Sequence, residues 1–171
     1  MRSTTTLSTV LTLLSLCMAS HIQAGEVQPS PNGIELPQDY KDWPVISVSH
    51  RVDNNTLRAI IGNEIAVKAA REGQTAPWPT GTILGKLVWK QTEEKYWPAA
   101  ISPKTFVHAE FMLKDPKKYT NGTGWGWARW LGKEQKPWSD QADAQQACIS
   151  CHTVVKAPSQ DWVFTTPAPL P

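Results

Sequence analysis

Hydrophobic and polar positions alternate with a period of two over much of the chain, which is the pattern of half-buried β-strands. Prolines and glycines separate the alternating stretches and mark turns between them. The pattern predicts four strands, at Val45–Val52, Thr82–Lys90, Thr105–Leu113 and Gly124–Leu131. We expect these strands to form an antiparallel sheet.

A helical spacing between the first two strands predicts one long early helix. Asp53-Asn54-Asn55-Thr56 offers side chains that cap helix N-termini, and Gly73 ends the segment. Apolar residues follow the cap at helical spacing, at Leu57, Ile60, Ile61, Ile65 and Ala69. A second helix is predicted to begin at Ser139 or Asp140 and to run through residues 148–152. The predicted fold class is α+β: mainly antiparallel β-sheet, one long early helix and a C-terminal helix.

The N-terminus has the organisation of a secretory signal peptide, with Arg2, an apolar stretch and a small-residue cleavage region that ends at Ala24. The apolar stretch is too short to span a bilayer, and we predict no membrane span. Cys17 raises the alternative of a lipid anchor, which Leu16 before it disfavours. The predicted organisation is a cleaved signal peptide (1–24), an extended arm (25–44) and a single domain (45–171).

Charge and cysteine content narrow the classes of function. The chain has 17 basic and 15 acidic residues, and this near-neutral balance without basic clusters argues against nucleic acid and anionic membranes as partners. Of the three cysteines, Cys17 falls in the predicted signal peptide, so the mature chain keeps only Cys148 and Cys151. No disulfide framework is predicted.

The most specific motif is Cys148-Ile149-Ser150-Cys151-His152, the attachment signature of c-type haem. On a helix, residues three and four apart share a face, so both sulfurs can bond the haem vinyl groups while His152 binds the iron. A redox dithiol expects a βαβ setting and a structural zinc site needs a second ligand pair, and the chain has neither. We predict covalent haem c on a C-terminal haem-bearing helix. We predict that the protein is located in the periplasm, because bacteria attach c-type haem outside the cytoplasm.

The opposite side of the iron has few candidate ligands, namely Met112, His50 and His108. A plain electron carrier would need one of them, and the chain shows no ligand loop after the motif, which disfavours that function. Strand alternation gives Val107, Ala109, Phe111 and Leu113 an apolar face, and gives the other face Phe106, His108, Glu110 and Met112.

Two charged residues on predicted strands have two interpretations each. Glu110, among aromatic and thioether groups, lies at an exposed edge or lines a pocket. Lys86 lies between Leu84 and Val88 on its predicted strand. Either its aliphatic stem lies along apolar surface while the ammonium reaches water, or the side chain belongs to a functional site. The alternation alone leaves both pairs of interpretations open.

The sequence resembles the cytochrome P460 family, the lysine-cross-linked c-haem proteins of ammonia- and methane-oxidising bacteria, over nearly the whole predicted mature chain. The segments that carry the resemblance are Asp42-Trp43-Pro44-Val45-Ile46, Ser49-His50-Arg51, Asp53-Asn54-Asn55-Thr56-Leu57-Arg58, Pro79-x-Gly81-x-x-x-x-Lys86, His108-Ala109-Glu110-Phe111, Gly124-Trp125-Gly126 and the Cys-x-x-Cys-His motif.

The resemblance implies a mostly β-sheet homodimer with a haem iron open to substrate. Such proteins oxidise hydroxylamine to nitrous oxide or nitrite, and a soluble acceptor such as a c-type cytochrome takes the electrons. A lysine nitrogen bonds a meso carbon of the porphyrin; Lys86 best matches this lysine, with Lys68 and Lys90 as alternatives. Glu110 best matches the carboxylate that accepts protons, and Lys86 and Glu110 would form two sides of one distal pocket.

The alternative function is gas binding. Cytochrome c′-beta proteins are similar in fold, lack the lysine cross-link and bind nitric oxide or carbon monoxide in a pocket capped by apolar residues. Lys86 and Glu110 in candidate pocket positions favour the enzyme.

Overall fold

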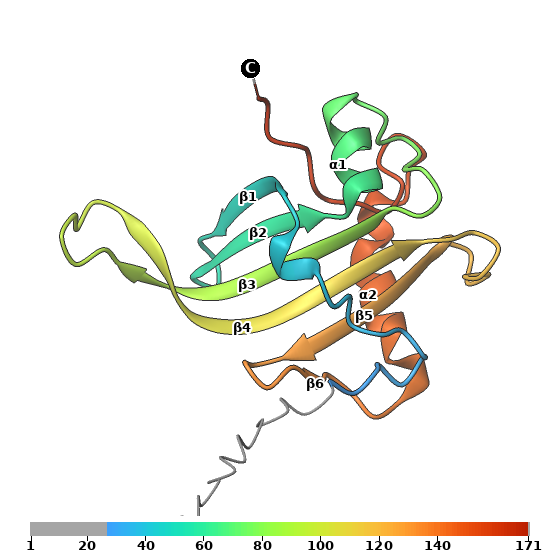
Figure 1. Ribbon diagram of the computed structural model, residues 1–171, viewed down its shortest axis with the longest axis horizontal. Helices are drawn as coiled ribbons and strands as arrows, with labels where there is room; N and C mark the ends of the chain where they lie inside the picture. The colour runs from blue at the N-terminus through green and yellow to red at the C-terminus, as the bar shows by residue number, and fades with distance from the viewer. Residues whose placement is uncertain (1–26, 171) are drawn as a thin grey trace, which may run out of the picture.

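The computed structural model describes residues 27–170, so the predicted signal peptide lies outside the described residues. One antiparallel sheet dominates the fold, and each strand pairs with its neighbours in the chain (Figure 1). Its strands are β1 (Val45–Arg51), β2 (Thr56–Gly62), β3 (Ile83–Glu93), β4 (Ile101–Lys114), β5 (Trp125–Leu131) and β6 (Lys136–Pro137).

The predicted antiparallel sheet is confirmed. Each of the four predicted strand ranges contains a strand, at β1, β3, β4 and β5. Strands β3 and β4 extend beyond the predicted ranges into a hairpin that projects from the sheet (Figure 1).

The predicted long early helix is wrong. Strand β2 occupies the first part of that range, and helix α1 is short, spanning Glu64–Arg71. Asp53 and Asn54 lie in the turn of the β1–β2 hairpin, where Asn55 adopts a left-handed φ of 54°. The cap of α1 is Asn63, whose side-chain oxygen accepts a hydrogen bond from the backbone N–H of Ala66 at 3.1 Å.

The predicted C-terminal helix is present as α2 (Gln145–His152), and it begins later than the predicted start at Ser139 or Asp140. Short 3₁₀ turns precede and follow it, at Ala142–Ala144 and Thr153–Val155, and a third lies at Tyr40–Asp42. Within residues 27–170, no helix combines the length and the apolar character that a membrane crossing requires.

One face of the sheet, here called the arm face, is covered by residues 27–44. Ile34, Leu36 and Tyr40 from this arm are buried against Phe111 of β4. The Phe111 ring makes edge-to-face contacts with Tyr40 and Trp130, at centroid distances of 5.4 and 6.0 Å. Gly85 allows this packing, because a Cβ atom there would lie 2.8 Å from the Phe111 ring.

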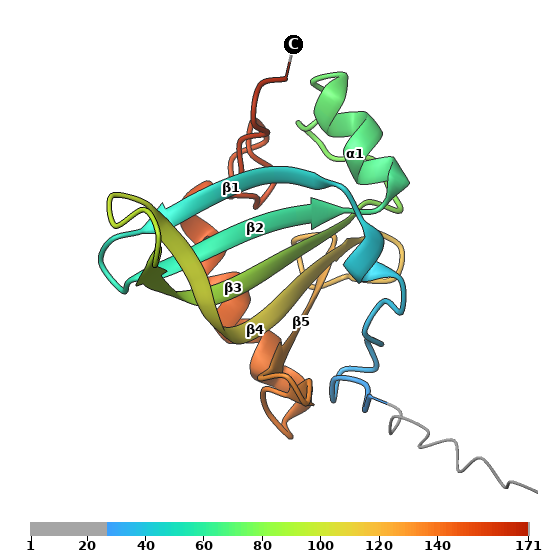
Figure 2. The ribbon, with the colours of Figure 1, turned by 60° about the vertical axis from the view of Figure 1, so that its left-hand side comes forward.

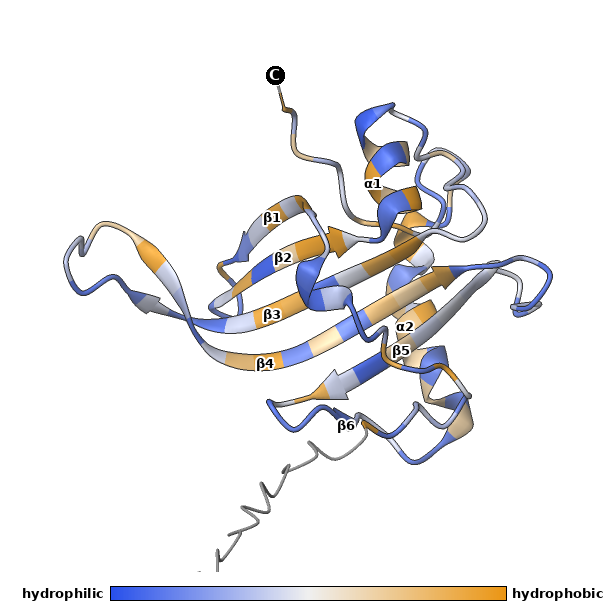
Figure 3. Ribbon diagram, in the orientation of Figure 1, coloured by the Kyte–Doolittle hydropathy of each residue, from blue (hydrophilic) through white to orange (hydrophobic). Residues whose placement is uncertain are grey.

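The opposite face, here called the helix face, carries α2 and the residues that follow it (Figure 2). Leu84, Met112, Trp125 and Trp127 from the strands pack there with apolar residues of α1 and of the C-terminal segment. Figure 3 shows the hydrophilic and hydrophobic positions interleaved along β3 and β4. The two faces therefore share strands and differ in which alternate residues they present.

The predicted face of Phe106 is wrong. The pairing of β3 with β4 shifts between Val88–His108 and Trp89–Phe106, which leaves Val107 as the extra residue of a β-bulge. The bulge reverses the alternation before His108. Phe106 therefore packs on the arm face, where its ring contacts Trp89 at a centroid distance of 5.9 Å.

Candidate functional site

Three charged side chains form a row across the helix face. Lys86 of β3 lies directly opposite Glu110 of β4, and Glu110 lies directly opposite Arg129 of β5. Directly opposite residues of paired strands point to the same face at close range. Lys86 Nζ and Arg129 Nη2 accordingly form ion pairs with different oxygens of the Glu110 carboxylate, Oε2 and Oε1. We call these three residues the charged row.

The charged row keeps Glu110 ionised. Its side chain is only 16% exposed. Burial raises the pKa of Glu110, but the positive charges of Lys86 and Arg129 outweigh burial and hold that pKa below its ordinary value. At neutral pH the site therefore contains a carboxylate that can accept a proton and two cations that stabilise it.

His108 borders the charged row and is neutral. Its Nε2 lies 3.5 Å from Oε1 of Glu110. Burial lowers the pKa of His108 to about 4. His108 consequently adds a polar ring beside the carboxylate without adding a third positive charge at neutral pH.

Helix α2 presents the Cys-x-x-Cys-His motif on the same side of the sheet. The Cys148 thiol is half-buried and the Cys151 thiol is exposed, and both are free. His152 lies between Trp127 and Phe164, with ring centroids 4.6 and 4.8 Å away. Its Nδ1 donates a hydrogen bond to the carbonyl oxygen of Trp162 at 2.7 Å. Nε2 is therefore the ring nitrogen left to bind a metal.

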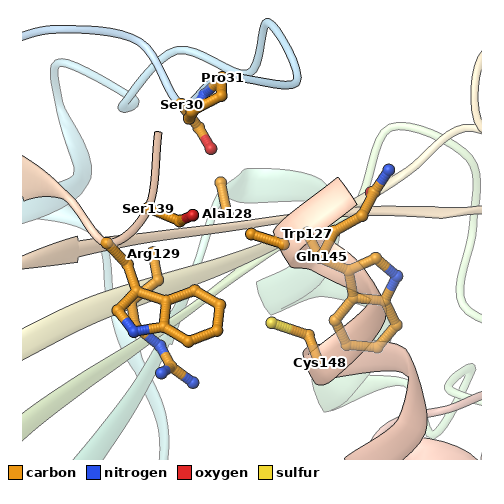
Figure 4. Close-up of a pocket in the computed structure, with 10 residues that line it drawn as sticks. Ser30, Pro31, Trp127, Ala128, Arg129, Ser139, Gln145 and Cys148 are labelled. Atoms are coloured by element: carbon orange, nitrogen blue, oxygen red, sulfur yellow. The ribbon is translucent and has the colours of Figure 1, made fainter. Parts of the chain in front are cut away.

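A small hollow connects the motif to the charged row (Figure 4). It has a volume of about 10 Å³ and is lined by Cys148, Gln145, Trp127 and Arg129. The Arg129 guanidinium lies over the ring of Trp138, 4.4 Å from its centroid. A volume of this size holds about one water. The evidence for a cofactor therefore comes from the donor groups of the motif and not from the size of the hollow.

The donor groups fit a haem. Two free thiols and an imidazole with a fixed tautomer are the set that covalent haem ligation uses. None of the residues of α2 is buried, so the motif remains accessible. Three buried nitrogens on the helix face have no hydrogen-bond partner within the described part of the chain, and a bound group with oxygen atoms would suit them: Nε of Arg58, Nε1 of Trp127 and Nε of Arg129.

A sheet with a charged row facing a Cys-x-x-Cys-His helix defines a class of β-sheet protein that carries a haem-attachment motif. The family comparison is more specific: the model of the family described as Cytochrome P460 matches residues 37–165, and the chain belongs to this family. It is a family of haem enzymes, which gives the chain a haem cofactor. A comparison with curated proteins finds no match.

Lys86 contacts Glu110, whereas the two alternative lysines, Lys68 and Lys90, lie elsewhere. Lys68 lies on α1, and the Lys90 ammonium donates to the carbonyl of Asn54 at 3.4 Å. Lys86 and Glu110 lie on neighbouring strands of a single sheet face.

The other candidate ligands lie outside the charged row. His50 is exposed on β1, where its ring hydrogen-bonds the side chain of Gln91. Met112 packs against the apolar residues of the helix face.

Arg129 is the main site residue that sequence reasoning missed. Trp125, Trp127 and Arg129 alternate along β5, so the arginine shares a face with two buried aromatic residues. A charge at an alternate position of an otherwise apolar strand was the available signal, the same signal that singled out Lys86.

Proposed function

We propose that the protein is a periplasmic c-type haem enzyme that oxidises hydroxylamine, with haem bonded to Cys148 and Cys151 and with His152 as the proximal ligand. The observation that carries the proposal is the charged row, which holds an ionised, largely buried Glu110 on the face that the motif helix covers. A gas-binding pocket capped by apolar residues has no use for this carboxylate.

In the proposed reaction, Glu110 acts as general base. Oxidation of hydroxylamine releases protons as well as electrons, and a carboxylate beside the substrate can accept a proton from it. The bound haem supplies the electron acceptor. Arg129 keeps Glu110 ionised before the reaction and favours release of the proton afterwards, since a positive charge disfavours the protonated acid.

The proposal includes a bond between Lys86 Nζ and a meso carbon of the haem. Such a bond would replace the meso C–H bond and release two electrons and three protons, so its formation would need an external two-electron oxidant such as a peroxide. It would convert the lysine ammonium to an N-aryl amine, which is uncharged at neutral pH. Arg129 would then be the remaining cation in contact with Glu110. The arginine therefore has a defined task in the cross-linked protein: it keeps the carboxylate ionised after Lys86 has lost its charge.

Further parts of the proposal follow from family membership. The products are nitrous oxide or nitrite, a soluble acceptor such as a c-type cytochrome receives the electrons, and the protein is a homodimer. A predicted signal peptide, which lies outside the described residues, supports export to the periplasm.

Steady-state oxidation of hydroxylamine with an artificial electron acceptor tests the function. Glu110→Gln keeps the shape of the side chain and removes the base, and we expect kcat to fall by roughly 10²–10⁴-fold at unchanged haem content. Glu93→Gln, at the exposed end of β3, is the matched control and should keep wild-type activity. Haem-loaded wild-type protein that binds nitric oxide or carbon monoxide but leaves hydroxylamine unoxidised would contradict the proposal.

A further inference from the structure

The carbonyl that holds His152 belongs to a short loop after α2. Trp162 accepts the hydrogen bond from His152 Nδ1, and its own backbone N–H donates to the carbonyl of Val155 at 2.8 Å. Backbone bonds from Gln160 and Asp161 to the carbonyl of Ala157, each 2.8 Å, close the loop. The position of the Trp162 peptide thus determines where the histidine ring can point.

A buried ion pair ties this loop to the sheet. The Lys114 ammonium, at the end of β4, donates to Oδ1 of Asp161 at 2.7 Å, and both residues are 8% exposed. The backbone N–H of Trp78 donates to Oδ2 of Asp161 at 2.9 Å. The indole N–H of Trp125 donates to the Asp161 carbonyl at 3.0 Å. The Lys114 ammonium also lies 4.9 Å from the centroid of the Trp125 ring.

The backbone at this point is strained. Asp161 and Trp162 have φ values of 46° and 68°, a left-handed conformation that residues with a Cβ atom rarely adopt. Two such residues in succession persist only where the surroundings over-determine them. The contacts of the Asp161 side chain hold the loop in this conformation, because they join it to β4 and to the segment before β3.

We infer that the Lys114–Asp161 pair is a positioning device that sets the strength of His152 as an axial ligand through the Trp162 carbonyl. The inference rests on the proposed function, because it needs His152 to ligate the haem iron. A hydrogen bond from Nδ1–H to a carbonyl fixes the ring and makes the other nitrogen a stronger donor. A stronger axial donor stabilises ferric iron and lowers the reduction potential. Asp161 acts through Trp162 and His152.

Asp161→Asn in the haem-loaded protein is the first test. The amide keeps the size of the side chain, removes its charge and presents an NH₂ group to either Lys114 or Trp78. We expect the loop to loosen, the reduction potential to shift to more positive values, and the iron–histidine stretching band of the ferrous protein to shift to lower frequency. Asp53→Asn, which removes the acid of an exposed ion pair with Arg51, is the matched control and should shift neither quantity.

A second variant protects the test against misfolding. Asp161→Asn leaves the Lys114 charge buried and unpaired, which is destabilising. The double variant Asp161→Asn/Lys114→Met removes both charges. Whichever of the two variants folds should show the positive shift in reduction potential and the lower iron–histidine stretching frequency. Lys114→Arg retains the ion pair and should stay close to wild type in both measurements.

These measurements separate the inference from the proposed function, because they use no hydroxylamine. Wild-type protein without a histidine-ligated haem would contradict the proposed function. A folded Asp161→Asn protein, or a folded double variant, with wild-type potential and wild-type stretching frequency would overturn the inference alone.

Discussion

The arm face and the helix face of the sheet are made from alternate residues of the same strands, yet they are built differently. On β4, Phe111 is 1% exposed and is enclosed by aromatic rings of the chain's own N-terminal arm. Glu110, one residue earlier, is 16% exposed and is held by cations from two neighbouring strands. The comparison shows that both faces bury apolar side chains and that the helix face adds a row of charged side chains to them.

This division predicts different consequences for substitutions on the two faces. Apolar burial contributes most of the folding free energy, so changes on the arm face should lower stability. An ion pair withdrawn from water gains little net stability, because desolvation offsets the attraction. A single change in the charged row leaves a partly buried charge without its partner, which lowers stability, and it should in addition alter chemistry and pH dependence.

Phe111→Ala should have the largest effect on stability. Removing a fully buried ring leaves a cavity, and the free energy of unfolding should fall by about 3–5 kcal/mol. Urea denaturation measures this fall. Met112→Leu, the next residue on the other face, conserves volume and should cost less than about 1.5 kcal/mol. A loss below about 1.5 kcal/mol in Phe111→Ala would show that this ring does not contribute the packing described.

His108 should make stability depend on pH. In the folded protein burial lowers the pKa of His108 from 6.5 to about 4, so the unfolded chain binds a proton first as the pH falls. The free energy of unfolding should therefore decrease by about 3 kcal/mol between pH 6.5 and 4 on account of this group. Denaturation at a series of pH values measures this fall. The free energy of unfolding of His108→Gln should change less with pH over this window, and that of His50→Gln should change as much as in wild type.

Arg129→Gln should shift the acid limb of the activity profile. The arginine lowers the pKa of Glu110, so its loss raises that pKa. The base form of Glu110 is present only above this pKa, and activity should consequently be lost at a higher pH than in wild type. The pH dependence of kcat for hydroxylamine measures the shift. Lys133→Gln, an exposed change just after β5, is the control, and an unmoved acid limb in Arg129→Gln would exclude coupling to Glu110.

Alternation and the Cys-x-x-Cys-His motif correctly predicted features that are determined by residues close together in the chain. Alternation within residues 105–113 correctly separated Glu110 from Phe111, and the motif correctly indicated a helix around residues 148–152. The same reasoning failed at β2, because Leu57, Ile60 and Ile61 fit a helix and a strand equally by spacing. Their partners in β1 and β3 decide the outcome, and single-sequence periodicity contains no information on partners.

The contacts that assemble the site are non-local, and this is why the sequence did not predict them. Lys86 faces Glu110 because of the register of β3 with β4, which the bulge at Val107 interrupts. Lys114 and Asp161 are 47 residues apart and meet only because the loop after α2 returns to the sheet. Family resemblance indicated Lys86 and Glu110, whereas the role of Asp161 and the contact of Arg129 with Glu110 required the folded chain.

The central claim is that Lys86 and Glu110 belong to a hydroxylamine-oxidising haem site, and mass mapping of the haem peptide tests it most directly. The account predicts a tryptic haem peptide that contains Cys148 and Cys151 and carries a second peptide with Lys86, together with a strongly red-shifted ferrous Soret band. Haem attached through the two cysteines alone, with an ordinary Soret band, would contradict the account and leave a gas-binding protein in which Lys86 pairs with Glu110.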